Sequence, residues 1–229
     1  GGTNSGHSIH LQTGHITERP PVAPEQRSSR SSSYFTIHTQ LPTMGHHTFD
    51  AGKAAKLEDA AARYQSVSRE ELLWGLDLTG AETVVDLGSG TGFYTDDIAP
   101  HADRVYAVDI QEEMHDHYRE KGVPENVELV TSGIEGLPFD DDELDRAVST
   151  MTYHEFATDE ALAELARVLA SGGRLVVADW SADGTGEDGP PLSERFSERE
   201  AATALDAAGF EIEFRATRPE TFLIVATRR

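Results

Sequence analysis

The sequence contains no cysteine, only three lysines and no apolar run long enough to cross a membrane. Without cysteine, the chain forms no disulfide, no thiolate metal site and no cysteine nucleophile. A membrane-spanning helix needs about 20 mostly apolar residues, and no apolar signal-peptide core stands near the N-terminus either. We therefore expect a protein without a membrane span that stays in the cytoplasm.

Positive charge is also scarce, because 41 Asp and Glu residues face 19 Lys and Arg residues and give a net charge of −22. A field of this sign repels phosphate backbones, so we do not expect nucleic acid as a substrate. The composition resembles that of proteins from extreme halophiles. In molar salt the Debye length falls to about 3 Å, which screens the repulsion between surface carboxylates. We expect folding and activity to require high salt.

The first 43 residues differ from the rest of the chain. They hold two acids against three arginines, are rich in Ser, Thr, Pro and Gly, and show no sustained apolar period. We predict a disordered extension over residues 1–43, which is either foreign to the natural protein or an over-extended start, and one domain over residues 44–229. His46 and His47 lie at this boundary. Two adjacent histidines without further ligands are typical of a polar terminus, so we expect no metal site.

Beyond residue 49 the apolar pattern alternates between helical and strand periods. Helices are predicted at Lys53–Tyr64, Ser68–Leu76, Gly92–Ala99, Gln111–Glu120, Asp159–Leu169 and Glu198–Ala208. Strands are predicted at Thr83–Asp86, Arg104–Asp109, Val127–Val130, Arg146–Ser149, Gly173–Ala178, Phe210–Arg215 and Phe222–Thr227. This alternation predicts an α/β fold, a doubly wound and mostly parallel sheet with helices on both faces. The last two strands have no helix between them, which indicates an antiparallel C-terminal hairpin.

The most informative segment is VVDLGSGTGFYT, residues 84–95, in which an apolar strand ends at Asp86 and opens into Gly88, Gly90 and Gly92. A dinucleotide site needs G-x-G-x-x-G/A, and neither reading frame of this turn supplies the third glycine. A carboxylate at the strand end repels a diphosphate and attracts an ammonium group. The turn therefore favours a cationic nucleoside such as S-adenosylmethionine over a nicotinamide dinucleotide.

From about Phe49 onward the chain resembles class I S-adenosylmethionine-dependent methyltransferases, particularly the ubiquinone/menaquinone C-methyltransferase-like branch. Five segments match the family's motifs in order: VVDLGSGTG, VYAVDI, ELVTSGIEGLPF, LDRAVSTMTYHEF and ELARVLASGGRLVVADW. The resemblance implies a Rossmann-like seven-stranded sheet of order 3-2-1-4-5-7-6. It also implies S-adenosylmethionine as cofactor and S-adenosylhomocysteine as product.

The resemblance further implies which residues bind the cofactor, since ligands of open α/β sheets lie beyond the carboxyl ends of the strands. Asp86 would accept from the methionine amino group, although it could instead cap the next helix. Asp109 would accept from both ribose hydroxyls, and Ile110 would pack on adenine or belong to the core. The full predicted set is Asp86, Gly88, Ser89, Gly90, Gly92, Asp109, Ile110, Ile134, Glu135 and Ser149.

The third motif departs from the family pattern. Relatives often carry an aspartate that accepts from the adenine amino group, but Gly133 stands in that place. The backbone N–H of Ile134 is still expected at the adenine ring, with Glu135 or Ser132 as a substitute acceptor.

Methyl transfer depends on alignment and exclusion of water, and a general base helps where the acceptor carries a proton. His154 is the first candidate for a base or substrate contact and Tyr153 the second, because both follow the fourth strand. The alternative is that His154 caps or packs the next helix. Enzymes that methylate exocyclic amines of nucleobases or glutamine amides carry N/D-P-P-Y/F at this place. This chain has Ser149-Thr150-Met151-Thr152 instead, which favours a small-molecule acceptor.

Residues outside the five motifs also suit positions around the pocket. Phe93 and Tyr94 could flank the cofactor, and Arg63 and Tyr64 could form part of a lid, although both pairs also suit core or surface positions. The Gly- and Pro-rich connection at 180–197 suits a lid or a mobile loop. It is short and has few apolar residues, so we expect an acceptor pocket that is either open or completed by the N-terminal helices.

We therefore predict a methyltransferase that acts on an unidentified small-molecule acceptor. The alternative is a protein that binds S-adenosylmethionine or S-adenosylhomocysteine without turnover, as a regulatory or assembly partner. The sequence does not determine the oligomeric state.

Overall fold

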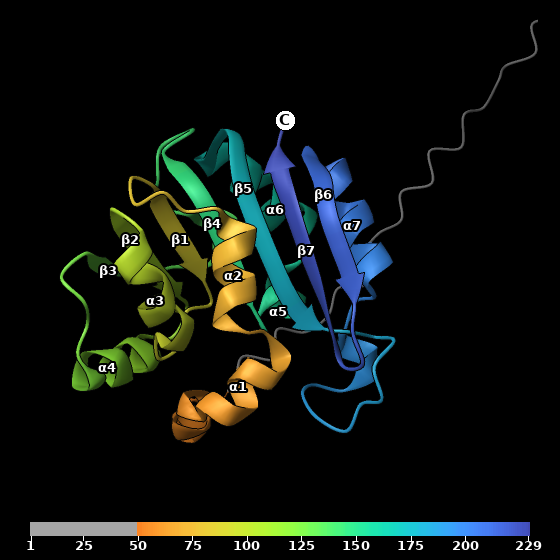
Figure 1. Ribbon diagram of the computed structural model, residues 1–229, viewed down its shortest axis with the longest axis horizontal. Coiled ribbons are helices and arrows are strands. Elements are labelled where there is room, and N and C mark those ends of the chain that lie inside the picture. Colours follow the sequence, from red (N-terminus) through yellow and green to blue (C-terminus); the bar gives the residue numbers. More distant parts are fainter. Residues whose placement is uncertain (1–49) are drawn as a thin grey trace, which may run out of the picture. The chain divides into compact units, whose positions relative to one another are not determined.

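The computed structural model describes residues 50–229 of the 229-residue chain. The expected extension at 1–43 and the pair His46 and His47 lie outside the described residues. Seven strands form one sheet: β1 (Thr83–Leu87), β2 (Arg104–Asp109), β3 (Val127–Thr131), β4 (Leu144–Thr150), β5 (Leu169–Trp180), β6 (Phe210–Thr217) and β7 (Thr221–Arg228). Their order is β3-β2-β1-β4-β5-β7-β6, as the family resemblance implied (Figure 1).

Strand direction follows the predicted pattern. The pairs β1–β2, β1–β4, β2–β3 and β4–β5 are parallel, whereas β7 is antiparallel to both β5 and β6. The C-terminal hairpin is thus confirmed, and the fold is the Rossmann-like, mostly parallel sheet that the alternating pattern predicted.

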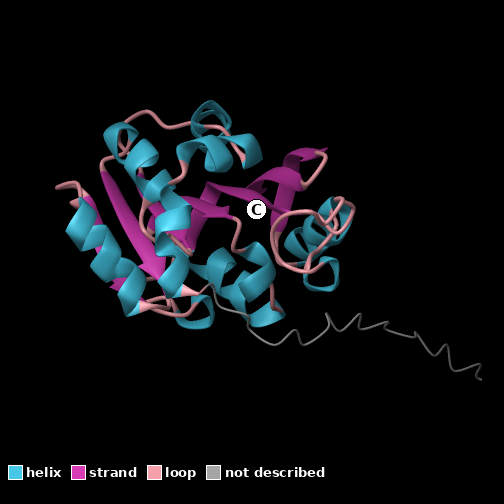
Figure 2. Ribbon diagram, turned by 90° about the horizontal axis from the view of Figure 1, so that it is seen from below, coloured by secondary structure: helices cyan, strands magenta, loops and turns pink. Residues whose placement is uncertain are grey.

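Helices cover both faces of this sheet (Figure 2). They are η1 (Ala51–Glu58), α1 (Ala60–Ser66), α2 (Arg69–Leu76), α3 (Phe93–Ile98), η2 (Ala99–His101), α4 (Glu112–Lys121), η3 (Ile134–Gly136), α5 (Tyr153–Phe156), α6 (Asp159–Val168), η4 (Leu192–Glu194) and α7 (Glu198–Ala207). One apolar core joins the sheet to α5, α6 and α7, and a second joins the opposite face to α2 and α3. The central strands β1, β4, β5 and β7 are therefore held from both sides by burial of apolar surface.

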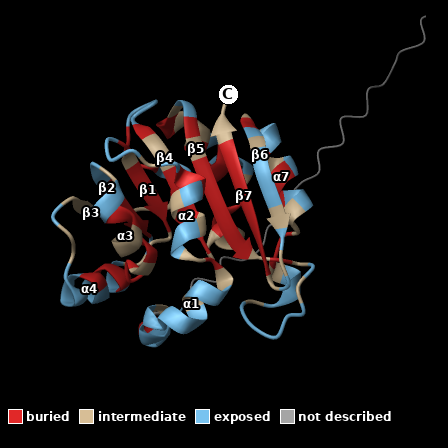
Figure 3. Ribbon diagram, viewed as in Figure 1, coloured by how far each residue is buried: buried red, intermediate tan, exposed pale blue. Residues whose placement is uncertain are grey.

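The central strands are buried along almost their whole length, whereas the edge strands are not (Figure 3). On the edges, exposed acids such as Glu128 of β3 and Glu211 and Glu213 of β6 point away from the cores. Charged side chains on edge strands discourage pairing with another chain. The sheet is consequently apolar along most of its central strands and charged at its borders.

Three local features differ from the sequence prediction. The single helix expected at Lys53–Tyr64 is divided at Asp59, because its side chain accepts from the N–H groups of Ala61 and Ala62 and starts a new helix there. Strand β5 starts at Leu169, four residues before the predicted Gly173. The short helix α5 after β4 was not predicted.

Within residues 50–229, no helix is long and apolar enough to cross a membrane. The same described residues contain no group of three or more His, Cys, Asp or Glu side chains placed to hold a metal ion.

Candidate functional site

A cavity of about 320 Å³ opens where β1, β2 and β4 end, at the centre of the sheet. Because these strands are parallel, their carboxyl ends share one edge, and α1 and α4 lie at the same end of the molecule (Figure 1). Of the predicted cofactor residues, seven line the cavity: Gly88, Ser89, Gly90, Asp109, Ile110, Ile134 and Glu135. The other predicted site residues, Asp86, Gly92, Ser149, Tyr153 and His154, are not among its lining residues.

The turn after β1 needs glycine for two different reasons. Gly88, Gly90 and Gly92 have backbone φ angles of 73°, 55° and 78°, which residues other than glycine rarely adopt. A Cβ on Gly88 would lie 2.3 Å from Cγ2 of Thr152, next to the cavity. A Cβ on Gly92 would lie 2.1 Å from Cε1 of Tyr118, a fully buried ring of α4. Gly88 therefore permits close approach at the site, whereas Gly92 permits helix packing behind it.

Asp109 is fixed in place at the end of β2. Its Oδ2 accepts from the backbone N–H of Gly90 at 2.9 Å, and its Oδ1 accepts from the N–H of Gln111 at 2.9 Å. An ionised carboxylate has about four acceptor positions, so each oxygen retains one for a ligand. The structure thus presents two preoriented acceptor atoms on the cavity wall.

Asp86 lies behind this wall at the end of β1 and is 1% exposed. Its Oδ2 accepts from Oγ1 of Thr95 at 2.6 Å, while its Oδ1 is buried without a hydrogen-bond partner among residues 50–229. Burial raises the pKa of Asp86 to about 6, although Thr95 and the charge of Arg63 oppose that rise. The alternative prediction for Asp86 is that it caps the next helix. This accounts for only one of its oxygens, because Oδ2 accepts from Thr95 of α3 whereas Oδ1 bonds none of the described groups.

Arg63 of α1 lines the same cavity and supplies its positive charge. The guanidinium lies 4.6 Å from the ring centroid of Tyr94 and 5.6 Å from that of Phe93, and its Nε is buried without a hydrogen-bond partner in the described chain. Burial lowers the pKa of Arg63, and the nearby charges of Asp86 and Glu58 partly restore it. The N-terminal helices contribute Leu57 and Arg63 to the cavity wall, and their role in an acceptor pocket stays a prediction.

Ile110 and the segment 132–135 form a third part of the wall. Ile110 is 63% exposed, which excludes the core role considered for it. A Cβ on Gly133 would lie 3.2 Å from Oε2 of Glu135 and 4.0 Å from Cδ1 of Ile110. The carboxylate of Glu135 thus lies beside the place where an aspartate side chain at position 133 would begin.

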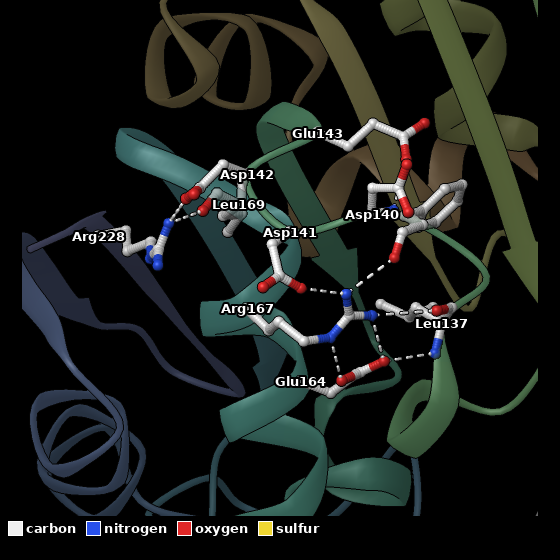
Figure 4. A network of polar contacts seen from close by, with 10 residues as sticks. Leu137, Asp140, Asp141, Asp142, Glu143, Glu164, Arg167, Leu169 and Arg228 are labelled. Carbon is white, nitrogen blue, oxygen red and sulfur yellow. Dashed lines mark hydrogen bonds and ion pairs between the residues drawn. The ribbon is translucent and has the colours of Figure 1, made fainter.

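Arg167 of α6 anchors the chain that follows this segment (Figure 4). Its guanidinium donates to both carboxylate oxygens of Glu164, to the carbonyls of Leu137 and Phe139, and to Asp141. Glu164 in turn accepts from the N–H of Leu137 at 2.9 Å. The network ties the loop after η3 to a helix packed on the sheet, which holds this part of the cavity wall in position.

The chain after β4 forms the remaining wall through Thr150, Met151, Thr152, Glu155 and Phe156. Met151 has φ of 59°, a left-handed conformation at the sharp turn from β4 toward α5. Ser149 is fully buried in β4, paired with Leu87 of β1, and its hydroxyl has no partner among the described residues.

The two predicted catalytic residues lie behind this wall. His154 Nδ1 lies 3.0 Å from the carboxylate of Asp179 on β5, and the backbone N–H of His154 donates to the same carboxylate at 2.6 Å. Tyr153 is 1% exposed, packs against Phe156, Phe196 and Phe222, and burial raises the pKa of its hydroxyl. Their catalytic roles stay predictions.

Glu155, which was not predicted from the sequence, lines the cavity and has a side chain that is 20% exposed. Burial raises the pKa of Glu155 to about 7, with the charges of Asp179 and Asp109 adding to that effect and His154 opposing it. The only available signal was its position beside His154, and a four-residue helix does not reveal from sequence which side chain faces the cavity.

The 180–197 connection, which the structure describes in full, contributes no residue to the cavity wall. Arg195 holds it by donating to the carbonyls of Pro190 and Ser181 and by an ion pair with Glu220 at 3.5 Å. The lid expected from its composition is thus not part of this pocket.

Comparisons with known proteins agree with this fold. A family described as a methyltransferase domain matches residues 85–177. A solved S-adenosylmethionine-dependent methyltransferase from Aquifex aeolicus superposes with a TM-score of 0.72 at 31% identity, covering 80% of this chain and all of that one (100%). The C-methyltransferase UbiE of ubiquinone/menaquinone biosynthesis from Vibrio vulnificus is 30% identical over 68% of this chain and 67% of its own length.

The chain belongs to the S-adenosylmethionine-dependent methyltransferase family. The biotin biosynthesis bifunctional protein BioHC from Cellvibrio japonicus is also similar, with 31% identity over 77% of this chain and 36% of its own length. The first curated relatives are mostly longer proteins, of which the chain spans 36% to 55%. Membership of the family therefore does not identify the molecule that this chain methylates.

Proposed function

We propose that this cavity binds S-adenosylmethionine and that the chain transfers its methyl group to a small molecule. When bound, this cofactor supplies a methyl group activated by a positively charged sulfonium. The single observation that carries the proposal is the Asp109 carboxylate, which the N–H groups of Gly90 and Gln111 hold on the cavity wall with acceptor positions to spare. Two such acceptors suit the paired hydroxyls of a ribose.

Two buried atoms without partners support an amino-acid end of the ligand near β1 and α1. Oδ1 of Asp86 can accept and Nε of Arg63 can donate, and neither has a hydrogen-bond partner among residues 50–229. A buried polar atom left unpaired is costly, so such atoms are expected to meet a ligand or water. An ammonium and a carboxylate on the same ligand would satisfy this acceptor and this donor.

The other end of the wall suits adenine. Ile110 presents an exposed apolar side chain, and Ile134 lines the same cavity from the segment after β3. Glu135 takes over the acceptor role of the missing aspartate, because its carboxylate lies next to Gly133. Ser132 is the second candidate acceptor, because its hydroxyl donates to the backbone carbonyls of Gly133 and Gly136 and keeps its lone pairs for accepting.

A small acceptor is supported by charge and by the relatives' printed names. The acids Asp109, Glu135 and Glu155 line the cavity and the whole chain carries −22, which disfavours a nucleic acid or another phosphate-rich partner. The names of BioHC and UbiE place those proteins in the biosynthesis of biotin and of quinones. The acidic composition also supports a halophilic origin and a cytoplasm of high salt as the working environment.

Calorimetric titration in molar KCl tests the donor site. S-adenosylhomocysteine should bind and NAD should not, because Asp86 and Asp109 repel a diphosphate. Binding of NAD in preference to S-adenosylhomocysteine would overturn the proposal. Incubation with methyl-labelled S-adenosylmethionine and a halophile extract then separates enzyme from binding protein. Transfer of label supports the enzyme, and binding without transfer supports the regulatory or assembly alternative.

A further inference from the structure

A row of three ionisable side chains leads from the core of the protein to the cavity. Asp179 is fully buried on β5, His154 lies beside it on α5, and Glu155 lines the cavity. His154 Nδ1 lies 3.0 Å from both oxygens of Asp179, and His154 Nε2 lies 3.9 Å from Oε1 of Glu155. The imidazole therefore stands between two carboxyl groups, of which only Glu155 borders the cavity.

The protonation of His154 follows from these contacts. A carboxylate only accepts hydrogen bonds, so Nδ1 carries the proton that faces Asp179. Burial lowers the pKa of His154, but the charge and hydrogen bond of Asp179, together with the charges of Glu155 and Glu194, outweigh burial and raise it. The raised pKa favours the protonated form of His154, and a positive charge there stabilises the carboxylate form of Glu155.

The groups that face Glu155 set a balance suited to proton transfer. Burial and the charges of Asp179 on β5 and Asp109 on β2 favour its neutral form, whereas His154 on α5 favours the carboxylate. The pKa of Glu155 lies at about 7 as a result. A proton acceptor is most effective when its pKa lies near the working pH.

We propose that Glu155 is the catalytic base for the methyl acceptor, that His154 and Asp179 are its positioning residues, and that the acceptor carries an O–H or N–H group. This inference rests on the proposed methyl transfer. The acceptor's oxygen or nitrogen forms a bond to the methyl carbon while the carbon–sulfur bond breaks and its electron pair stays on sulfur. The proton of the acceptor passes to the Glu155 carboxylate and from there to solvent.

The acceptor class follows from the chemistry of the base and its surroundings. The proton of an O–H or N–H group becomes strongly acidic as the new bond places positive charge on that atom, so a carboxylate can remove it. An unactivated C–H group has no such proton. Thr150 and Thr152 line the wall beside Glu155 and offer hydroxyls to a polar acceptor, and Phe156 offers an apolar ring.

The test compares wild type with Glu155→Gln and with the control Glu160→Gln, an exposed acid of α6 outside the cavity wall. Methyl-labelled S-adenosylmethionine is incubated with a defined mixture of phenols, catechols, anilines and aliphatic amines, and binding of S-adenosylhomocysteine is measured in parallel. We expect label in an O–H or N–H compound. Glu155→Gln should lower that rate about 10²-fold or more while its affinity for S-adenosylhomocysteine changes less than about twofold, and Glu160→Gln should match wild type.

Two further measurements separate a base from a structural residue. In a carboxyl ¹³C NMR titration, a signal with a midpoint near pH 7 should be present in wild type and missing from Glu155→Gln. The transfer rate should rise with pH through the same midpoint. His154→Gln should retain part of the activity and shift both midpoints upward, because the imidazolium no longer favours the carboxylate.

Each other outcome decides against the inference. An unchanged rate in Glu155→Gln, a flat pH profile, or label in carbon only or in none of the compounds while S-adenosylhomocysteine binds normally would overturn it and leave the donor site intact. A wild-type chain that does not bind S-adenosylhomocysteine would instead refute the proposed function itself.

Discussion

The backbone N–H of Gly90 donates to Oδ2 of Asp109 at 2.9 Å, across 19 residues of sequence. This bond ties the glycine turn after β1 to the end of β2. The carboxylate that is proposed to bind the ribose therefore also fixes the turn beside it.

The first prediction concerns this dual role of Asp109. Hydrogen bonds to charged groups contribute about 1.5–3 kcal/mol each, so Asp109→Ala should weaken binding of S-adenosylhomocysteine more than tenfold. Asp109→Asn should weaken binding nearly as much. An uncharged amide has only one oxygen, so it cannot accept from Gly90 and Gln111 through two separate oxygens as the carboxylate does. Calorimetric titration measures both affinities.

A matched control is Asp145→Ala. Asp145 also accepts from a backbone N–H, that of Thr83 at 2.9 Å, but at the opposite end of β1. This variant should lower the melting temperature without changing the affinity of the folded protein. Equal affinities for wild type and Asp109→Ala would remove Asp109 from the ligand site.

The second prediction concerns pH and Asp86. Burial raises the pKa of Asp86 to about 6, so in the free protein the group is mostly neutral below that pH. A ligand ammonium favours the ionised form, which means that binding at lower pH must first remove a proton. The affinity for S-adenosylhomocysteine should therefore be constant above about pH 7 and fall by about tenfold for each pH unit below 6.

Asp86→Asn tests the origin of that dependence. The variant should bind weakly and with nearly the same affinity at pH 5 and pH 7, because the amide does not titrate. A wild-type protein whose affinity is the same at pH 5 and pH 7 would show that Asp86 does not meet the ammonium.

The sequence predicted the sheet better than it predicted the site. Strand positions follow from apolar runs bounded by Gly, Pro and charged residues, and Asp109 and Gly90 meet because parallel strands end at one edge. Whether a motif residue faces the cavity depends on packing from distant segments. Gly92 belongs to the turn, yet its missing side chain makes room for the ring of Tyr118 on α4. On α5, His154 contacts Asp179 behind the wall, and the neighbouring Glu155 lines the cavity.

The third prediction follows from the position of Gly92. Gly92→Ala combines an unfavourable φ of 78° with a Cβ 2.1 Å from the Tyr118 ring, so we expect a loss of roughly 2–5 kcal/mol of folding free energy. Gly122→Ala is the control, because it has φ of 104° but nothing within 4 Å of its Cβ. Gly122→Ala should lose only about 1–2 kcal/mol of folding free energy.

Chemical denaturation in high salt measures both values. Under conditions where Gly92→Ala is folded, its affinity for S-adenosylhomocysteine should stay within a few-fold of wild type. A fully stable Gly92→Ala that no longer binds would instead assign Gly92 to the ligand.

The fourth prediction concerns Lys121, which links η1 to α3. Its Nζ lies 3.2 Å from Oε1 of Glu58 and 2.9 Å from Oδ2 of Asp96, and Glu58 also accepts from Thr91 of the glycine turn. Because Leu57 of η1 lines the cavity, these contacts of Lys121 hold one part of the cavity wall in place. Lys121→Met should raise the dissociation rate of S-adenosylhomocysteine several-fold in stopped-flow measurements.

Lys53→Met provides the control for the loss of one lysine charge. Lys53 pairs with Asp50 at 3.3 Å, but both side chains are more than half exposed and lie away from the cavity. Exposed ion pairs contribute about 0–1 kcal/mol, so this variant should release the ligand at the wild-type rate. Equally faster dissociation in both variants would indicate a general effect of charge and not a role of the Lys121 contacts in holding the cavity wall.

The fifth prediction concerns stability and Glu155. The pKa of Glu155 is about 7 in the folded protein and 4.5 in its ordinary state, so the folded chain binds more protons between these pH values. Its contribution to stability is therefore present at low pH and lost as pH rises through 7. Glu155→Gln removes the buried charge, so it should be near neutral at pH 5 and stabilising by roughly 1–3 kcal/mol at pH 8.

Glu82→Gln should show the opposite sign, which makes it the internal comparison. Burial opposes the charge of Glu82, but hydrogen bonds from Thr79 and from the N–H groups of Gly80 and Ala81 outweigh burial and lower its pKa to about 2. Its carboxylate is thus stabilising at pH 8, and the Gln variant should unfold at lower denaturant there. Denaturation at pH 5 and pH 8 distinguishes the two carboxyls. A Glu155→Gln variant that gains no stability between those pH values would mean that Glu155 is not held with a raised pKa beside the cavity.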